Sequence, residues 1–351
     1  MNLQQVATQL SDELARSVVV VGLDDRELAA SAPAALGEPS HGELNRLAVP
    51  IRGGTGTIAS FWLESEKRPP LSSTDYALID AAAGIARDLL SDGLDPRPGS
   101  NRDTTMARLL DDSLAARRSA FLDAVAHRWV DRGKRTVVRA VMLDDSVGTL
   151  QRVAFGRHVA AATPAATTFV REHESIVYLV TRETGAVDAL DERIRAESVR
   201  LDVPVLSIGS AHHDPSTDDL GDTATQARVA AELTAALPEL QPAKDIAELG
   251  GWVLLHGVSA GSKSLVDISP AAEHLCRAGD RVQRETIETY LDAGGQARAA
   301  CERLHIHRTT LYYRLDNMPP VVKEALDDGM KRSTLHLTLK LIRLWEETGA
   351  L

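Results

Sequence analysis

The sequence predicts a multidomain α+β protein that ends in an all-α-helical domain. Short apolar runs typical of β-strands alternate with helical patterns up to about residue 237. From Ser269 onward the pattern is mostly helical. The chain has 351 residues, and at roughly 100–200 residues per domain this length indicates two or three domains.

The composition restricts the class of protein. No run approaches about 18 consecutive apolar residues, so no transmembrane helix and no membrane partner are expected. Residues 1–5 lack the basic and apolar regions of a signal peptide. Two cysteines cannot form a disulfide framework, so a reducing cytoplasm is the expected location.

The charge is unevenly distributed along the chain. The formal net charge is -11, but residues 281–351 hold 11 Lys and Arg against 10 Asp and Glu. Residues 296–315 contain four arginines and a single acid, Glu302. An acidic body with a basic helical stretch is typical of a regulator that carries a small DNA-reading module.

Residues 1–94 form the first predicted domain, which is closed by a linker at 95–100 with two prolines and a glycine. Apolar runs in this domain predict β-strands at 17–22, 47–51 and 57–63. The last two strands flank a glycine-rich sequence that predicts a hairpin turn.

An amphipathic helix follows, capped by a serine or threonine at 72–74. The strand pair, together with the helix that includes residues 73–83, resembles a shortened GAF-type sensory domain. The resemblance implies a small-molecule pocket on one face of the sheet. Trp62 is the candidate ligand-binding residue, and packing in the core is the alternative role for it.

Residues 101–261 form the second predicted domain, an α/β sandwich of alternating strands and helices. A tight turn at 171–174 is expected between its second and third strands. The expected strands lie at 136–143, 166–170, 175–180 and 204–210, and the expected helices at 106–129, 148–162, 187–200 and 217–237.

Residues 269–351 form the third predicted domain. A helix at 286–291 ends at Gly294 and Gly295, because glycine adopts the left-handed conformation of a helix C-terminus without steric cost. A second helix at 296–304, a short turn and a third helix at 308–318 follow. Helix, tight turn and helix with a cationic outer face predict a helix-turn-helix.

The sequence Ile306-His307-Arg308-Thr309-Thr310-Leu311-Tyr312-Tyr313-Arg314-Leu315 resembles the signature of PucR/CdaR-type bacterial transcription regulators. That signature is an apolar residue followed by His-Arg-Asn-Thr-Leu-x-Tyr-Arg-Leu. This chain departs from it at Thr309, where asparagine is usual, and at Tyr312, where arginine is frequent. The run at 335–341 resembles the closing helix of the family.

The resemblance implies that the outer face of the third helix binds DNA. Arg308 would contact bases or phosphate, and Arg314 would contact phosphate. His307 either caps the helix or contacts phosphate. The predicted DNA-binding residues are His307, Arg308, Thr309, Thr310, Tyr312, Tyr313 and Arg314.

The middle domain resembles the degenerate GGDEF-like domain of the same family, at 207–210 and 224–230. The hairpin at 171–174 lacks the glycines that let a nucleotide phosphate approach the backbone. Asp144 and Asp145 could still offer carboxylates to a divalent cation. A nucleotide-binding middle domain or an enzyme related to cyclic dinucleotides therefore remains an alternative function.

Other constellations of reactive residue types favour ordinary structural roles. Cys301, His305 and His307 lack the further cysteine pair of a zinc site. Residues 212–214 (His-His-Asp) follow a strand without a nucleophile motif, so a solvated loop is expected there. We expect no catalytic residue, no metal and no cofactor.

Together these features predict a cytoplasmic bacterial transcription regulator and not an enzyme. The resemblance implies double-stranded DNA and a small-molecule effector as partners, and a metabolite-responsive catabolic operon as the target. One recognition helix covers only a few base pairs, so a homodimer or higher homo-oligomer is expected. A protein-interaction module that does not bind DNA is the remaining alternative.

Overall fold

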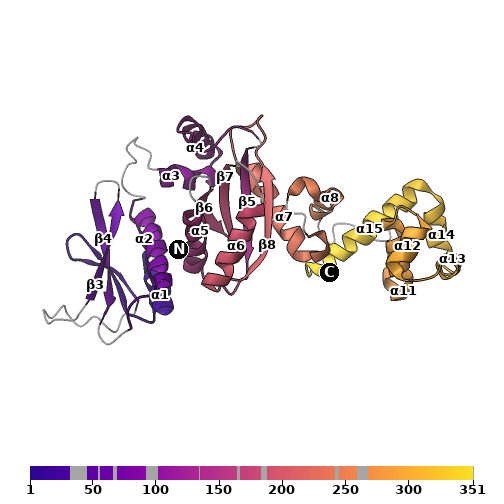
Figure 1. Cartoon of the computed structure of the whole chain (residues 1–351), viewed down its shortest axis with the longest axis horizontal. Helices are drawn as coiled ribbons and strands as arrows, with labels where there is room; N and C mark the ends of the chain where they lie inside the picture. Colours follow the sequence, from indigo (N-terminus) through magenta and orange to yellow (C-terminus); the bar gives the residue numbers. More distant parts are fainter. Residues whose placement is uncertain are drawn as a thin grey trace. The chain divides into compact units, whose positions relative to one another are not determined.

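The computed structural model describes most of the chain in two compact units (Figure 1). The first contains Met1–Ala235 with Lys244–Ala247, and the second contains Ala236–Ala243 with Glu248–Leu351. The predicted linker at 95–100 lies outside the described residues. These are 1–31, 46–53, 56–65, 69–91, 102–133, 135–163, 167–182, 188–241, 245–258 and 268–350.

The N-terminal part of the first unit is a four-stranded antiparallel sheet with the strand order β2-β1-β4-β3. Helices α1 and α2 cover one face of it (Figure 1). The three predicted strands and the predicted helix are confirmed, whereas α1 and β2 were not predicted. The elements are α1 (Leu3–Leu14), β1 (Val18–Gly22), β2 (Glu27–Ala30), β3 (Arg46–Gly53), β4 (Gly56–Glu64) and α2 (Ser73–Ser91).

Side chains of β4 alternate between the two faces of this sheet, as a strand with one covered face requires. Phe61 and Leu63 are fully buried against the helices, whereas Trp62 is half-exposed on the other face. The same core includes Leu150 and Val153 of a helix that follows in the chain, which joins this sheet to the middle sheet in one unit.

The middle sheet is also antiparallel, with the strand order β6-β7-β5-β8, and helices cover both of its faces. This two-sided cover explains why β5 is buried along nearly its whole length. Its elements are α3 (Arg102–Ala107), α4 (Leu114–Ala126), β5 (Thr136–Leu143), α5 (Thr149–Ala162), β6 (Thr167–His173), β7 (Ile176–Arg182), α6 (Asp188–Leu201), β8 (Val205–His212) and α7 (Gly221–Ala236).

The strands predicted for this sheet are confirmed, but the single helix expected at 106–129 is wrong. A short 3-10 turn, Arg108–Leu110, follows α3, and α4 begins only at Leu114. The Ser113 hydroxyl accepts a hydrogen bond from the backbone N–H of Ala116 and so caps α4. The helix expected from 217 begins at Gly221.

The tight turn expected at 171–174 is also wrong. Strand β6 continues to His173, and the turn is formed by Glu174 and Ser175, which both adopt positive φ angles of 49° and 62°. A two-residue turn of this kind matches the twist of an antiparallel hairpin. Neither residue is the glycine that usually marks such a turn, so the local sequence gives no signal for its position.

The second unit is helical, as the sequence predicts. Residues 248–258, expected in the middle domain, lie in this unit, where the Trp345 indole donates a 3.0 Å hydrogen bond to the Val258 carbonyl. No described helix is long and apolar enough to cross a membrane. The helices are α8 (Gly251–His256), α10 (Pro270–Arg277), α11 (Arg281–Asp292), α12 (Ala297–Leu304), α13 (Arg308–Asp316), α14 (Pro320–Asp327) and α15 (Gly329–Glu347).

Candidate nucleic-acid interface

The candidate interface begins at the junction of α11 and α12. Gly294 and Gly295 follow α11 with φ angles of 63° and 77°, so both adopt the left-handed conformation that the sequence predicts. The Gly295 N–H donates to the Tyr290 carbonyl at 2.9 Å and satisfies one of the last free carbonyls of α11. These contacts let the chain reverse within a few residues into α12.

A second sharp turn joins α12 to α13. His305 ends α12 in the left-handed conformation, with φ 53° and ψ 40°. His307 then caps α13, because its Nδ1 accepts a hydrogen bond from the backbone N–H of Thr309 at 3.4 Å. The capping interpretation of His307 is therefore confirmed, and the turn fixes the start of the candidate recognition helix.

A small core holds the two helices together. Ala300 of α12 and Leu311 of α13 are fully buried, and Leu304, Ile306 and Leu315 pack around them. Cys301 packs partly buried against the same cluster. In the described part of the chain, no group of three or more histidine, cysteine or acidic side chains could hold a metal ion.

The outer face of α13 is polar and aromatic. His307, Arg308 and Thr309 are exposed, and Tyr312 and Tyr313 are 43% and 71% exposed. Tyr313 thus lies on the surface and does not cover the edge of the core. Thr310, also among the predicted DNA-binding residues, is half-buried.

Arg308 and Tyr312 form a pair one helical turn apart. The Arg308 guanidinium donates a 3.0 Å hydrogen bond to the Tyr312 hydroxyl, and its carbon lies 5.3 Å from the centre of the Tyr312 ring. The hydrogen bond raises the pKa of Arg308. The hydrogen bond and the ring contact hold the guanidinium, which is cationic at pH 7 like any arginine, on the exposed face of α13.

Arg314 differs from the expectation that it faces outward. It is only partly exposed, and its guanidinium donates a 3.1 Å hydrogen bond to the hydroxyl of Thr286, a buried residue of α11. Arg314 therefore connects α13 to α11, and its contact with phosphate remains a prediction. Arg303, which is not among the predicted contacts, is exposed in the last turn of α12.

Trp62, the candidate ligand-binding residue, lies far from α13 in the sequence and in a different unit. It occupies the face of the N-terminal sheet that α1 and α2 do not cover, and the Arg46 guanidinium lies 5.7 Å from its ring centre. Core packing is therefore the role of its neighbour Phe61 and not of Trp62. The binding of a ligand by Trp62 remains a prediction.

The carboxylates of Asp144 and Asp145, directly after β5, accept hydrogen bonds from nearby residues. Asp144 accepts a 2.9 Å hydrogen bond from the Ser146 N–H, and Asp145 accepts one of 2.7 Å from the Ser175 hydroxyl. A nucleotide-binding middle domain would place a divalent cation at these two carboxylates. In the structure, each carboxylate instead accepts a hydrogen bond from a neighbouring protein group.

The prediction of a solvated loop at 212–214 is wrong for its central residue, His213, which is buried. His213 is only 1% exposed, and its Nδ1 accepts a 3.0 Å hydrogen bond from the Gly133 N–H. Burial lowers the pKa of His213. The neutral imidazole thus connects the end of β8 to the turn before β5, which is a structural role.

Comparison with known proteins supports the helix-turn-helix. Residues 283–341 match the family described as the PucR C-terminal helix-turn-helix domain. No curated protein matches the chain. Among solved structures, the regulator of polyketide synthase expression from Bifidobacterium adolescentis aligns over 70% of this chain and 95% of that chain, at 16% identity and a TM-score of 0.31.

Proposed function

We propose that the protein is a sequence-specific, DNA-binding transcription regulator. The match of residues 283–341 to the PucR C-terminal helix-turn-helix domain carries this proposal. In that motif, the second helix of the pair enters the major groove and presents side chains to base edges. Here that helix is α13.

The exposed side chains of α13 supply suitable chemistry for this role. Arg308 would read base edges or bind phosphate, and Thr309 would meet a thymine methyl group or a phosphate. The hydroxyls of Tyr312 and Tyr313 would reach phosphate oxygens. Arg314 would position α13 through Thr286 and reach the DNA backbone with its remaining donors.

The regulator would act in the cytoplasm as a homodimer or higher homo-oligomer, because one α13 covers too few base pairs for useful specificity. A GAF-like N-terminal domain would sense a small-molecule effector on the sheet face that carries Trp62. A catalytically inactive GGDEF-like middle domain would transmit the signal. The target would be a metabolite-responsive catabolic operon, and effector binding would shift the population of DNA-competent dimers.

Selection of bound fragments from bacterial genomic DNA at about 150 mM salt tests this function. Purified wild type should enrich discrete sites. Arg308→Ala should bind those sites about ten- to a hundredfold more weakly, because it lacks the cation that α13 presents to DNA. The decrease of its affinity with salt should also be shallower if Arg308 contacts phosphate.

Arg277→Ala is the matched control, since Arg277 is an exposed arginine on α10 of the same unit. Its affinity and its selected sites should equal those of wild type. Equal enrichment by Arg308→Ala and wild type would remove the assignment of the α13 face. The failure of wild type to enrich any site, with and without added metabolite pools, would favour a protein-interaction module.

A further inference from the structure

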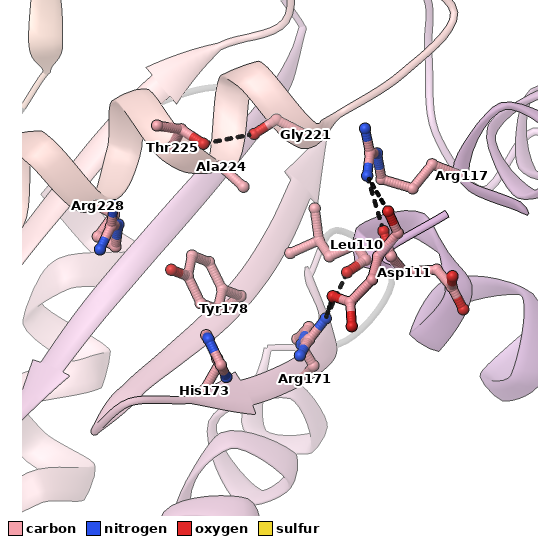
Figure 2. Close-up of a pocket in the computed structure, with 11 residues that line it drawn as sticks. Leu110, Asp111, Arg117, Arg171, His173, Tyr178, Gly221, Ala224, Thr225 and Arg228 are labelled. Carbon is pink, nitrogen blue, oxygen red and sulfur yellow. Dashed lines mark hydrogen bonds and ion pairs between the residues drawn. The ribbon is translucent and has the colours of Figure 1, made fainter. Parts of the chain in front are cut away.

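The middle domain contains a pocket of about 290 Å³ on the sheet face that α4 and α7 cover. The pocket combines three arginines with a tyrosine and a histidine (Figure 2). Its lining residues are Leu110, Asp111, Asp112, Arg117, Arg171, His173, Tyr178, Gly221, Ala224, Thr225 and Arg228.

An irregularity in β6 aims two of these side chains into the pocket. The register between β6 and β7 shifts between Phe169 and Arg171, so that Arg171 pairs with Tyr178 and His173 with Ile176. Tyr178 and Ile176 belong to the core under α7, so Arg171 and His173 face the same side. A bulge of this kind commonly re-aims side chains next to functional sites.

Tyr178 is the central polar group of the pocket. The residue is only 6% exposed, and no hydrogen bond to its hydroxyl is found among the described residues, although the hydroxyl is not sealed from water. Figure 2 places its ring between α7, which carries Arg228, and β6, which carries Arg171. Burial raises the pKa of Tyr178, although the positive charges of Arg228 and Arg171 oppose that shift. Tyr178 thus offers a neutral O–H donor at pH 7.

The Tyr178 hydroxyl is accessible to water from the pocket, because it is not among the described buried polar atoms that lack a partner, and it can exchange that water for a ligand acceptor. Such a group is expected to find a partner when the pocket is filled. Because the two arginines lie beside it, a ligand that accepts hydrogen bonds and carries negative charge would satisfy all three donors.

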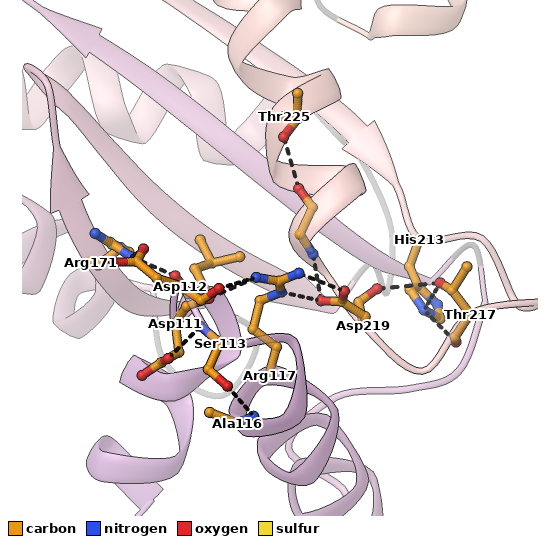
Figure 3. Close-up of polar contacts among 12 residues, drawn as sticks. Asp111, Asp112, Ser113, Ala116, Arg117, Arg171, His213, Thr217, Asp219 and Thr225 are labelled. Carbon is orange, nitrogen blue, oxygen red and sulfur yellow. Dashed lines mark hydrogen bonds and ion pairs between the residues drawn. The ribbon is translucent and has the colours of Figure 1, made fainter.

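The rim of the pocket is held by a separate ion pair (Figure 3). Arg117 donates to both carboxylate oxygens of Asp219 at 2.8 and 3.2 Å, and to the Asp111 carbonyl at 2.9 Å. Asp219 also accepts a 2.8 Å hydrogen bond from the Gly221 N–H at the start of α7. Arg117 therefore fixes the loop before α4 against the start of α7. Its N–H groups already donate to protein acceptors, so we do not count it among the ligand donors.

The other two arginines are less constrained. Arg171 uses Nη1 to donate to the Leu110 carbonyl, and the same atom lies 3.6 Å from the fully exposed Asp112. Arg228 lies 3.3 Å from Glu232 and 3.9 Å from Glu174, again through Nη1. In the described part of the chain, the remaining guanidinium N–H groups of both arginines are therefore available to a ligand.

We propose that this pocket binds the carboxylate or phosphate group of a small metabolite, with Tyr178, Arg171 and Arg228 as the hydrogen-bond donors. The site is distinct from the effector site proposed on the N-terminal sheet, and it does not depend on DNA binding. Its volume of about 290 Å³ lies just below the roughly 300–1,000 Å³ typical of ligand pockets. That size fits a small anionic metabolite and not a cyclic dinucleotide.

Isothermal titration of the full-length protein with succinate and, separately, with inorganic phosphate tests the proposal. Binding of either anion to wild type is expected, and the preferred anion identifies the class of the natural ligand. Succinamide, which has a similar shape without the charges, should bind at least about tenfold more weakly than succinate if the arginines recognise charge.

Tyr178→Phe removes only the hydroxyl and should weaken binding of the preferred anion about tenfold or more, as should Arg228→Gln. Matched controls are Tyr76→Phe on α2 and Arg200→Gln on α6, which lie outside the pocket and should bind as wild type does. Thermal unfolding without ligand checks that each variant is folded.

Two outcomes would overturn the proposal. One is the absence of binding of both anions to wild type at concentrations up to about 10 mM, where even a weak site would be occupied. The other is equal affinity in wild type and the Tyr178→Phe/Arg228→Gln double variant. Neither outcome affects the proposed DNA binding, which fragment selection tests separately.

Discussion

The middle sheet and the helix-turn-helix use the same residue type in opposite ways. In the middle sheet, Arg139 of β5 and Asp191 of α6 form a 3.4 Å ion pair, and their side chains are only 2% and 3% exposed. In the second unit, Arg308 lies on an exposed surface with Tyr312 as its neighbour. Burial, and not the presence of an arginine, therefore decides whether the charge stabilises the fold or binds a partner.

The pocket in the middle sheet lies between these extremes. Arg117 is committed to Asp219, whereas Arg171 and Arg228 border a concave space about as large as a small metabolite. The outer face of α13 presents its side chains on a convex helix, which suits the major groove of a duplex. The shape of the surface around each arginine thus separates the two expected classes of ligand.

The largest expected effect on stability comes from a substitution that breaks the buried ion pair of Arg139 and Asp191. Asp191→Ala should destabilise the protein by about 3–5 kcal/mol, because it leaves the Arg139 charge buried without its carboxylate. Urea unfolding measures this loss. The double variant Arg139→Met/Asp191→Leu should recover much of it, since two apolar side chains of similar volume remove both charges. A loss below about 1 kcal/mol in Asp191→Ala would contradict a structural role for the pair.

A smaller effect tests how closely α7 packs on the middle sheet. A Cβ atom on Gly209 of β8 would lie 2.2 Å from the Ala227 carbonyl oxygen and 2.3 Å from the Ala231 nitrogen. Gly209→Ala should therefore cost about 1–3 kcal/mol in unfolding free energy and disturb the pocket beside α7. Gly329→Ala is the control, because nothing lies within 4 Å of its added Cβ. Equal stability of the two variants would show that α7 can move away from β8.

The smallest effect concerns an acidic group in the helical unit. Burial alone would raise the pKa of Asp292, but hydrogen bonds from His336 and Lys340 outweigh burial and lower it. Asp292 thus stabilises the fold above the unfolded-state pKa of about 3.9, and this contribution is lost as pH falls through the lower folded-state pKa.

Asp292→Asn should therefore be less stable than wild type at pH 6, by less than about 1 kcal/mol because the site is partly exposed. The difference should shrink toward pH 3, as urea unfolding at the two pH values would measure. A difference that grows at low pH would contradict the direction of the pKa shift.

Local patterns in the sequence were sufficient to predict the helices and strands whose conformation depends on residues close to them in the sequence. The two glycines after α11 predict the end of this helix. Ending a helix there requires only the left-handed backbone conformation, which Gly294 and Gly295 adopt without help from distant residues. The run 136–143 predicts β5, and the apolar spacing at 296–315 predicts α12 and α13. The missed helix α1 carried a local signal in the reciprocal cap between Asn2 and Gln5.

Tertiary structure alone decided the features that depend on residues far apart in the chain. Arg117 and Asp219 are 102 positions apart, so no local pattern predicts the rim of the pocket. The register shift in β6 turns Arg171 toward Tyr178. Packing of α13 on α11 likewise turns Arg314 toward Thr286. Helical and strand periodicity determined which residues form each element of this protein, whereas the direction of the polar side chains was decided by the partners that the fold brought to them.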